Sequence, residues 1–172
     1  MSRKSLLFVV ILLAAACNSN PVDRFFEGRY SLPEILFLVD GEGGRYVRTP
    51  TVRPVFIVWF SREDCSECAV SHLEEKFYYL TRLADQTNLF DVIFVMSPKD
   101  GETDHIAEMI SAYEFSWPVY LDTSNECEKL LPEDGRFHMF LMDTAGKPVW
   151  LGSPLKDGKI NGQFYAAINS LK

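Results

Sequence analysis

The chain has 172 residues, and its 24 aspartates and glutamates outnumber 17 lysines and arginines to give a net charge of −7. This length suits a single domain, and the 47% of apolar residues can supply a sizeable core. No basic block follows Arg3 and Lys4. The charge therefore argues against nucleic acid as a partner and against electrostatic adsorption to anionic lipid.

The N-terminal segment has the pattern of an export signal. Arg3 and Lys4 precede an unbroken apolar run at 6–16, which is shorter than the ~20 residues that a membrane-spanning helix needs. The run ends in Leu-Ala-Ala-Ala before Cys17, which resembles the lipobox of bacterial lipoproteins. This resemblance implies that Cys17 carries covalent lipid and becomes the mature N-terminus, with more than one acyl chain for stable anchoring. The alternative is an ordinary Ala-x-Ala cleavage site with a chance cysteine.

These features divide the chain into a signal peptide at 1–16, a lipid-anchored tether at 17–32 and a folded domain at 33–172. We therefore expect the protein in the bacterial cell envelope, held at the membrane through its lipid. Asn18 is not the aspartate that retains lipoproteins in the inner membrane of enteric bacteria. Outer-membrane attachment facing the periplasm is accordingly preferred.

Apolar periodicity predicts a single α/β domain. Residues 35–48 have the pattern of a β-hairpin around a glycine-rich turn, and 54–60 is a β-branched run typical of a strand buried on both faces. Helical spacing of apolar residues follows at 69–86. The later predicted elements are a buried strand at 89–97, a helix capped by Thr103 or Asp104, a strand at 117–122, a short helix at 125–131, a hairpin over 138–152 with Gly146 in its turn, and a last helix at 161–171.

Cys65 and Cys68 lie three positions apart, just before the helix predicted at 69–86. If Cys17 is lipidated, one further thiol remains in the oxidising envelope, Cys127, which is expected to be a buried small residue. A close pair with one odd thiol is a poor disulfide framework for a globular domain of this size. The pair is therefore predicted to be used chemically.

The order of elements and three segments resemble the TlpA-like thiol–disulfide oxidoreductases, which are membrane-tethered thioredoxins of bacterial envelopes. "VFIVWFSREDCSEC" aligns without gaps with the strand and motif of that family, and "WPVYLD" and "FHMFLMDTAGKPVWLG" are similar to its later segments. The likeness covers about residue 33 to the end. It implies an α/β thioredoxin-like fold, with a central mixed sheet flanked by helices and an N-terminal β-hairpin extension.

The resemblance also implies roles for the two cysteines. Cys65 would attack first, and Cys68 would be the resolving thiol, facing inward. Exported protein thiols and disulfides would be the substrates, a membrane or periplasmic redox partner would reset the pair, and no organic cofactor would be needed. His72, four positions after Cys68, is the candidate to relay its proton, against the alternative of an exposed helix residue without a role.

Five positions depart from the family pattern: Asp64 replaces a tryptophan, Trp59 a buried strand carboxylate, Ser71 a glutamate, Leu73 a proline, and Phe137 the cis-proline opposite the cysteines. A non-proline cis bond costs ~3 kcal/mol, so the bond before Phe137 is expected to be trans. The ring of Phe137 is expected to cover the sulfur atoms, with His138 in the same cis-proline-equivalent loop.

Acidic residues surround the cysteine pair. At ~7 Å in water, each of Glu63, Asp64 and Glu67 destabilises a Cys65 thiolate by about 0.6 kcal/mol. The helix dipole stabilises the thiolate by about 0.3–1 kcal/mol. The pKa of the Cys65 thiol is therefore expected near or above its ordinary ~8.5. A poorly stabilised thiolate disfavours the reduced form, so the couple is predicted to act as a reductant.

Three interpretations follow. The leading one is a thiol–disulfide oxidoreductase. The second is a Cu(I)-binding or delivery protein of thioredoxin fold, with Cys65, Cys68, His138 and Met139 as ligands, because thiolate, imidazole and thioether groups suit Cu(I). The third is a non-catalytic thioredoxin-like scaffold with an inert disulfide.

Overall fold

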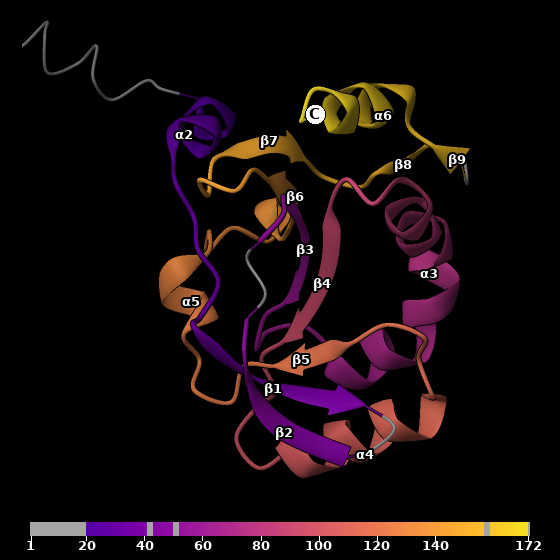
Figure 1. Ribbon diagram of the computed structural model, residues 1–172. Coiled ribbons are helices and arrows are strands. Elements are labelled where there is room, and N and C mark those ends of the chain that lie inside the picture. The colour runs from indigo at the N-terminus through magenta and orange to yellow at the C-terminus, as the bar shows by residue number, and fades with distance from the viewer. Residues whose placement is uncertain (1–19, 41–42, 50–51, 157–158, 172) are drawn as a thin grey trace, which may run out of the picture.

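A mixed seven-stranded sheet runs through the molecule, with helices on both faces (Figure 1). The computed structural model describes residues 20–40, 43–49, 52–156 and 159–171. In sheet order the strands are β2 (Gly43–Arg48), β1 (Ile35–Asp40), β5 (Val119–Leu121), β4 (Asp91–Met96), β3 (Val55–Phe60), β6 (Met139–Met142) and β7 (Pro148–Leu151). The described helices are α2 (Pro21–Glu27), α3 (Ser66–Thr87), α4 (Thr103–Tyr113), α5 (Cys127–Leu130), the 3-10 helix η1 (Gly135–Phe137) and α6 (Gly162–Asn169).

The sheet is parallel in its centre and antiparallel at both sides. β3 pairs with β4, and β4 with β5, in parallel, whereas β6 runs antiparallel to β3 and β7 antiparallel to β6. Parallel neighbours need a crossover, and α3 and α4 provide the two crossovers. The predicted N-terminal hairpin is confirmed: β1 and β2 pair with each other, and β1 extends the sheet by pairing with β5.

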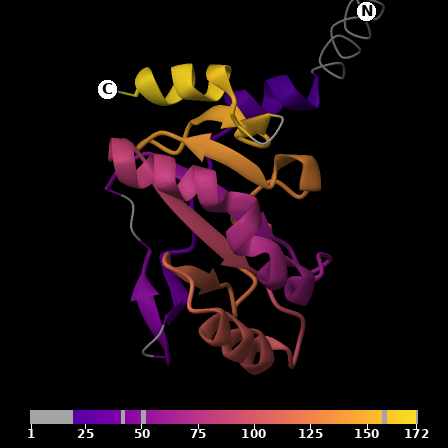
Figure 2. The same ribbon diagram turned by 90° about the vertical axis from the view of Figure 1, so that its right-hand side faces the viewer.

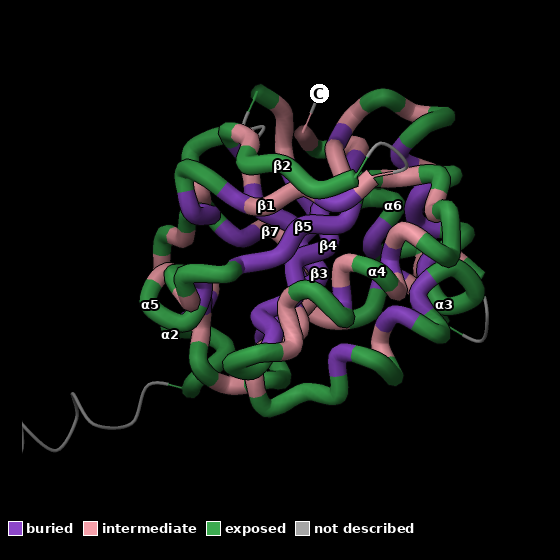
Figure 3. The backbone as a smooth tube through the Cα atoms, turned by 90° about the horizontal axis from the view of Figure 1, so that it is seen from below, coloured by how far each residue is buried: buried purple, intermediate pink, exposed green. Residues whose placement is uncertain are grey.

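Two cores lie on opposite faces of the sheet because side chains alternate along each strand. On β3, Phe56 and Val58 enter a first core with α3, α4 and α6, while Val55, Ile57 and Trp59 enter a second core with α2 and α5. Figure 1 shows α3 and α4 on one side of the sheet and α2 and α5 on the other. Figure 2 shows α3 lying across the face of the sheet that it covers. Most residues of the central strands β3, β4 and β5 are buried, as Figure 3 shows.

The segment expected to be a tether is partly folded onto the domain. α2 begins at Pro21, with the Asn20 side chain accepting a hydrogen bond from the Val22 amide at 3.0 Å. Phe25 is 2% exposed in the second core, and Leu32 is also buried there. The described part of the predicted tether, 20–32, is therefore part of the packed structure. The predicted signal peptide and Cys17 lie outside the described residues.

The element bounds differ from the sequence prediction in a few places. α3 begins at Ser66, three residues earlier than predicted, and Glu102 is the N-cap of α4 in place of Thr103 or Asp104. A small separate sheet of β8 (Leu155–Lys156) and β9 (Lys159–Ile160) was not predicted. Gly146 has the predicted positive φ, +76°. No helix in the described ranges combines the length and apolarity needed to cross a bilayer.

Candidate redox site

The cysteine pair sits where β3 ends and α3 begins. A tight turn joins the two elements: the Asp64 carboxylate accepts hydrogen bonds from the amide and the hydroxyl of Ser61, at 2.7 and 2.9 Å. Aspartate favours such a turn because its short side chain can bond to nearby backbone. The turn places Cys65 as the N-cap of α3. Its sulfur therefore faces the unpaired amides and the positive end of the helix dipole.

Cys65 and Cys68 form a disulfide, with their Cα atoms 5.2 Å apart. The Cys68 amide donates a hydrogen bond to the Cys65 sulfur at 3.3 Å. Both residues are exposed, so the expectation that Cys68 faces inward is wrong. Ser66 takes the inward position because it begins the buried stripe of α3, which continues through Val70 and Leu73. Cys68 is two positions from Ser66, on a different side of the helix.

The acidic flank, which comprises Glu63, Asp64 and Glu67, is faced by histidines. Glu67 Oε1 lies 3.0 Å from Nε2 of His105 on α4, and Asp64 Oδ2 lies 3.9 Å from Nδ1 of His138. Arg62, the nearest basic residue in sequence, pairs with Asp100 at 2.7 Å. Within the described residues, the recorded charge partners of the acidic flank are therefore histidines and not lysine or arginine.

Phe137 does not cover the sulfur atoms, contrary to expectation. Its ring is buried in the second core and stacks on Phe25 of α2, with 5.1 Å between ring centroids. The described residues contain no cis peptide bond, which confirms the trans bond predicted before Phe137. The Phe137 amide donates to the Asp134 carbonyl at 2.8 Å and closes η1. The ring thus points toward α2, and the disulfide stays open to solvent.

His138 is the residue of this loop that turns toward the cysteine turn. It is 8% exposed, and its ring centroid lies 4.2 Å from that of Trp59. Its Nε2 is buried and makes no hydrogen bond within the described structure. Burial lowers the pKa of His138, and the nearby Asp64 carboxylate opposes this shift. The His138 carbonyl accepts from the Trp59 amide at 2.9 Å, which ties the loop to β3.

The remaining candidate residues are not assembled into one group. His72 is exposed on α3, and no hydrogen bond or ion pair is recorded for it in the described structure. Met139 of β6 packs against the first core, whereas His138, in the loop before β6, lies on Trp59 of the second, so the two side chains lie on opposite faces of the sheet. Within the described ranges no three His, Cys, Asp or Glu residues are grouped to hold a metal ion. The structure therefore does not bring the proposed copper ligands together.

Sequence reasoning missed Asp122, which follows β5 and organises the segment around Cys127. Its buried carboxylate accepts from the amides of Cys127 and Glu126, at 2.7 and 3.1 Å, and from the Ser124 hydroxyl at 3.2 Å. The signal was an aspartate between a strand and a short helix, a typical capping position. Cys127 is fully buried, and burial, followed by the Asp122 charge, raises the pKa of its thiol strongly.

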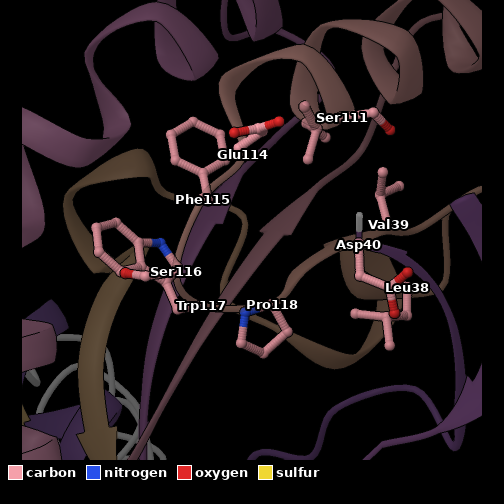
Figure 4. A pocket seen from close by; sticks show the side chains of 10 residues that line it. Leu38, Val39, Asp40, Ser111, Glu114, Phe115, Ser116, Trp117 and Pro118 are labelled. Carbon is pink, nitrogen blue, oxygen red and sulfur yellow. The ribbon is translucent and has the colours of Figure 1, made fainter. Parts of the chain in front are cut away.

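A cavity of about 440 Å³ lies elsewhere, between the end of α4, β1 and the segment before β5. Glu114, Phe115, Trp117 and Pro118 line one part of it, and Val39 and Asp40 of β1 another (Figure 4). Phe115 and Trp117 stack with 6.0 Å between ring centroids. Neither cysteine of the disulfide lines this cavity, and both are exposed at the surface.

Solved structures match this chain in fold. A proposed thiol:disulfide interchange protein DsbE from Chlorobium tepidum matches with a TM-score of 0.53 and 15% identity, over 84% of this chain and 97% of its own. A hypothetical protein from Sinorhizobium meliloti, SMc02350, matches with a TM-score of 0.52 and 15% identity, over 89% of this chain and 87% of its own. No protein-family model matches, and no curated protein matches in sequence.

These matches confirm the predicted thioredoxin-like fold, an α/β fold with a mixed central sheet flanked by helices. Fold and site together define a thioredoxin-like fold with a Cys-x-x-Cys disulfide at the start of α3. Because the identities are low, the likeness establishes the fold alone.

Cys127 should behave as a structural thiol. After reduction of the disulfide, iodoacetamide at pH 8 should alkylate Cys65 and Cys68 in the native protein and leave Cys127 unmodified, because its burial and raised pKa withhold the thiolate. Site-resolved mass spectrometry gives the result, with urea-unfolded protein as the control in which all three react. Alkylation of native Cys127 at a rate like that of Cys65 would contradict this assignment.

Proposed function

We propose that this protein is a lipid-anchored thiol–disulfide oxidoreductase of the bacterial envelope, which reduces disulfides of exported proteins through Cys65 and Cys68. The two sulfur atoms carry the electrons, so no organic cofactor is required. A membrane or periplasmic protein returns the pair to its dithiol form. The lipid on Cys17 would hold the domain at the membrane, with the outer membrane and its periplasmic side preferred.

One observation carries this proposal: the exposed disulfide at the first turn of α3. Burial protects a structural disulfide from reduction, whereas a pair that exchanges must be accessible to the sulfur atoms of another protein. The Cys65 sulfur also accepts an amide hydrogen bond and faces the positive end of the helix dipole. These contacts favour a thiolate at Cys65 over one at Cys68, and they replace the difference in exposure as the reason why Cys65 attacks first.

The exchange proceeds through one mixed disulfide. The Cys65 thiolate bonds to one sulfur of the substrate disulfide, and the other substrate sulfur leaves and takes up a proton. Cys68 then loses its proton and attacks Cys65, which releases the second substrate thiol and forms the Cys65–Cys68 bond. The substrate gains two electrons and two protons, and the protein dithiol loses the same number.

The charges around the pair support a reducing role. Asp64 and Glu67 face histidines in place of lysine or arginine, and Glu63 is exposed beside them. A negative potential at Cys65 disfavours its thiolate and therefore the reduced form, so electrons leave the pair readily. This balance supports a reductant more than a strong oxidase.

The order of attack can be tested by trapping. In cells, a Cys68→Ser variant should accumulate mixed disulfides with envelope proteins, because Cys65 can attack but no second thiol resolves the bond. Cys65→Ser should trap at least about tenfold less, and Cys127→Ser should resemble the wild type. Non-reducing gels of acid-quenched cells show the adducts. Equal trapping by the Cys65 and Cys68 variants, or none by either, would refute the assignment.

The direction of electron flow can be tested by equilibrating the protein with glutathione buffers. We expect a reduction potential below about −230 mV, which is more reducing than the glutaredoxin range. Replacing the acidic flank by Glu63→Gln, Asp64→Asn and Glu67→Gln should make the potential less negative, because the thiolate becomes more stable. A wild-type value near the −120 mV of strong oxidases would refute the reducing role.

The anchor can be tested separately. Cys17→Ala should abolish labelling by a fatty-acid analogue and move the protein out of the membrane fraction, whereas Cys127→Ala should not. A Cys17→Ala protein that remains in membranes after a high-salt wash would show that lipid on Cys17 is not the anchor.

A further inference from the structure

His138 occupies a distinctive place beside the acidic flank. It belongs to the loop before β6, far from the cysteines in sequence, yet its Nδ1 lies 3.9 Å from Oδ2 of Asp64. The same carboxylate oxygen accepts both hydrogen bonds from Ser61 that close the turn leading to Cys65. A change at His138 can therefore reach the nucleophile through one side chain, Asp64.

The charged groups around His138 favour a proton on its ring. Asp64 approaches from the β3–α3 turn, and Asp134 and the backbone carbonyls of Pro132 and Glu133 approach from the segment before η1. Each of these groups is negative or presents a carbonyl oxygen. The opposing effect is burial, which is the largest influence and lowers the pKa of the ring below its usual value. Reduction of the disulfide, followed by loss of the Cys65 proton, adds one more negative charge next to Asp64.

We propose that His138 is a positioning residue for the exchange at Cys65: when protonated, its ring pairs with Asp64 and weakens the negative potential at the sulfur, so that the thiolate remains available under mildly acidic conditions. This inference rests on the proposed function, which makes Cys65 the nucleophile. His138 thus supplies the positive charge that neither lysine nor arginine provides here, and supplies it according to pH.

Protonation of His138 and ionisation of Cys65 are thermodynamically linked. Above the pKa of His138 the ring is neutral, and Asp64 opposes the Cys65 thiolate in full. As the pH falls through that pKa, the ring gains its charge and the pKa of Cys65 decreases. The two groups then titrate as a coupled pair: a proton on His138 favours the thiolate, and the thiolate favours the proton on His138.

The test measures the rate at which iodoacetamide alkylates Cys65 in the reduced full-length protein, by site-resolved mass spectrometry between about pH 4.5 and pH 8.5. The wild type and His138→Gln should agree within about twofold at pH 8.5. Once the pH has fallen below the pKa of His138, the wild type should react about threefold faster than His138→Gln, the effect of one charge at ~7 Å in water. In a His105→Gln background His138→Gln should change the rate by the same factor, because His105 faces Glu67 and not Asp64.

The route through Asp64 has its own test. Asn at position 64 keeps an oxygen that can accept from Ser61 but removes the charge. In an Asp64→Asn background the ring of His138 also loses the carboxylate that favours its proton, so His138→Gln should change the rate by less than about 1.5-fold. Identical pH profiles for the wild type and His138→Gln, loss of the difference in the His105→Gln background, or an undiminished effect in the Asp64→Asn background would each overturn the proposal.

A second measurement needs no variant at His138. In an Asp64→Asn variant, the ring-proton resonance of His138 should titrate at a lower pH than in the wild type, because the carboxylate that favours the ring proton is gone. An unchanged titration midpoint would overturn the proposal even if His138→Gln did not fold. Neither measurement uses a protein substrate, so failure of envelope-protein trapping would refute the proposed function and leave this result standing.

Discussion

The burial of β3 on both faces is the constraint on which the rest of the structure depends. Residues 55–59 are each at most 3% exposed, and their side chains alternate between the two cores. A strand in this position has no freedom to slip, because a shift of one residue would exchange its two sets of contacts. The C-terminal end of β3 is therefore fixed in place. The hydrogen bonds from Ser61 to Asp64 close the turn that follows it, and they thereby fix the start of α3 as well. The disulfide is exposed, but the strand that supports it is deeply buried.

The local parts of this arrangement could be predicted from the sequence. The β-branched run of β3 and the apolar stripe of α3 are periodic signals confined to one stretch of chain, and both predictions were correct. The same stripe also predicts that Cys68 is exposed. Extending the stripe one helical turn back from Val70 leads to Ser66, and Cys68 lies on another side of the helix. The expectation that Cys68 faces inward came from the resemblance instead, and the periodicity was the better guide.

The parts that could not be predicted depend on contacts between distant segments. Phe25 is buried by Phe137 and Phe140, which are distant from it in sequence. The sequence of 17–32 alone therefore does not distinguish a packed helix from a tether. His138 and Asp64 likewise meet because β6 pairs with β3 and brings its leading loop next to the cysteine turn. Sequence alignment placed His138 near the cysteines, but it could not show that the ring is buried against Trp59 or that Asp64 is the group it faces.

Packing shapes the loop at Phe137, where the resembling family has a cis-proline. A cis-proline fixes the shape of a loop through its covalent geometry, whereas the loop with a trans bond before Phe137 depends on side-chain contacts. Phe137 stacks on Phe25, and Phe25 also contacts Phe140 on β6, so α2 holds both the loop and the strand that follows it. The backbone bond from Trp59 to His138 then ties the loop to β3. The loop beside the disulfide is therefore supported by a helix that begins at Pro21, close in sequence to the predicted lipid site at Cys17. The segment that follows the predicted lipid site therefore also supports the loop that carries His138.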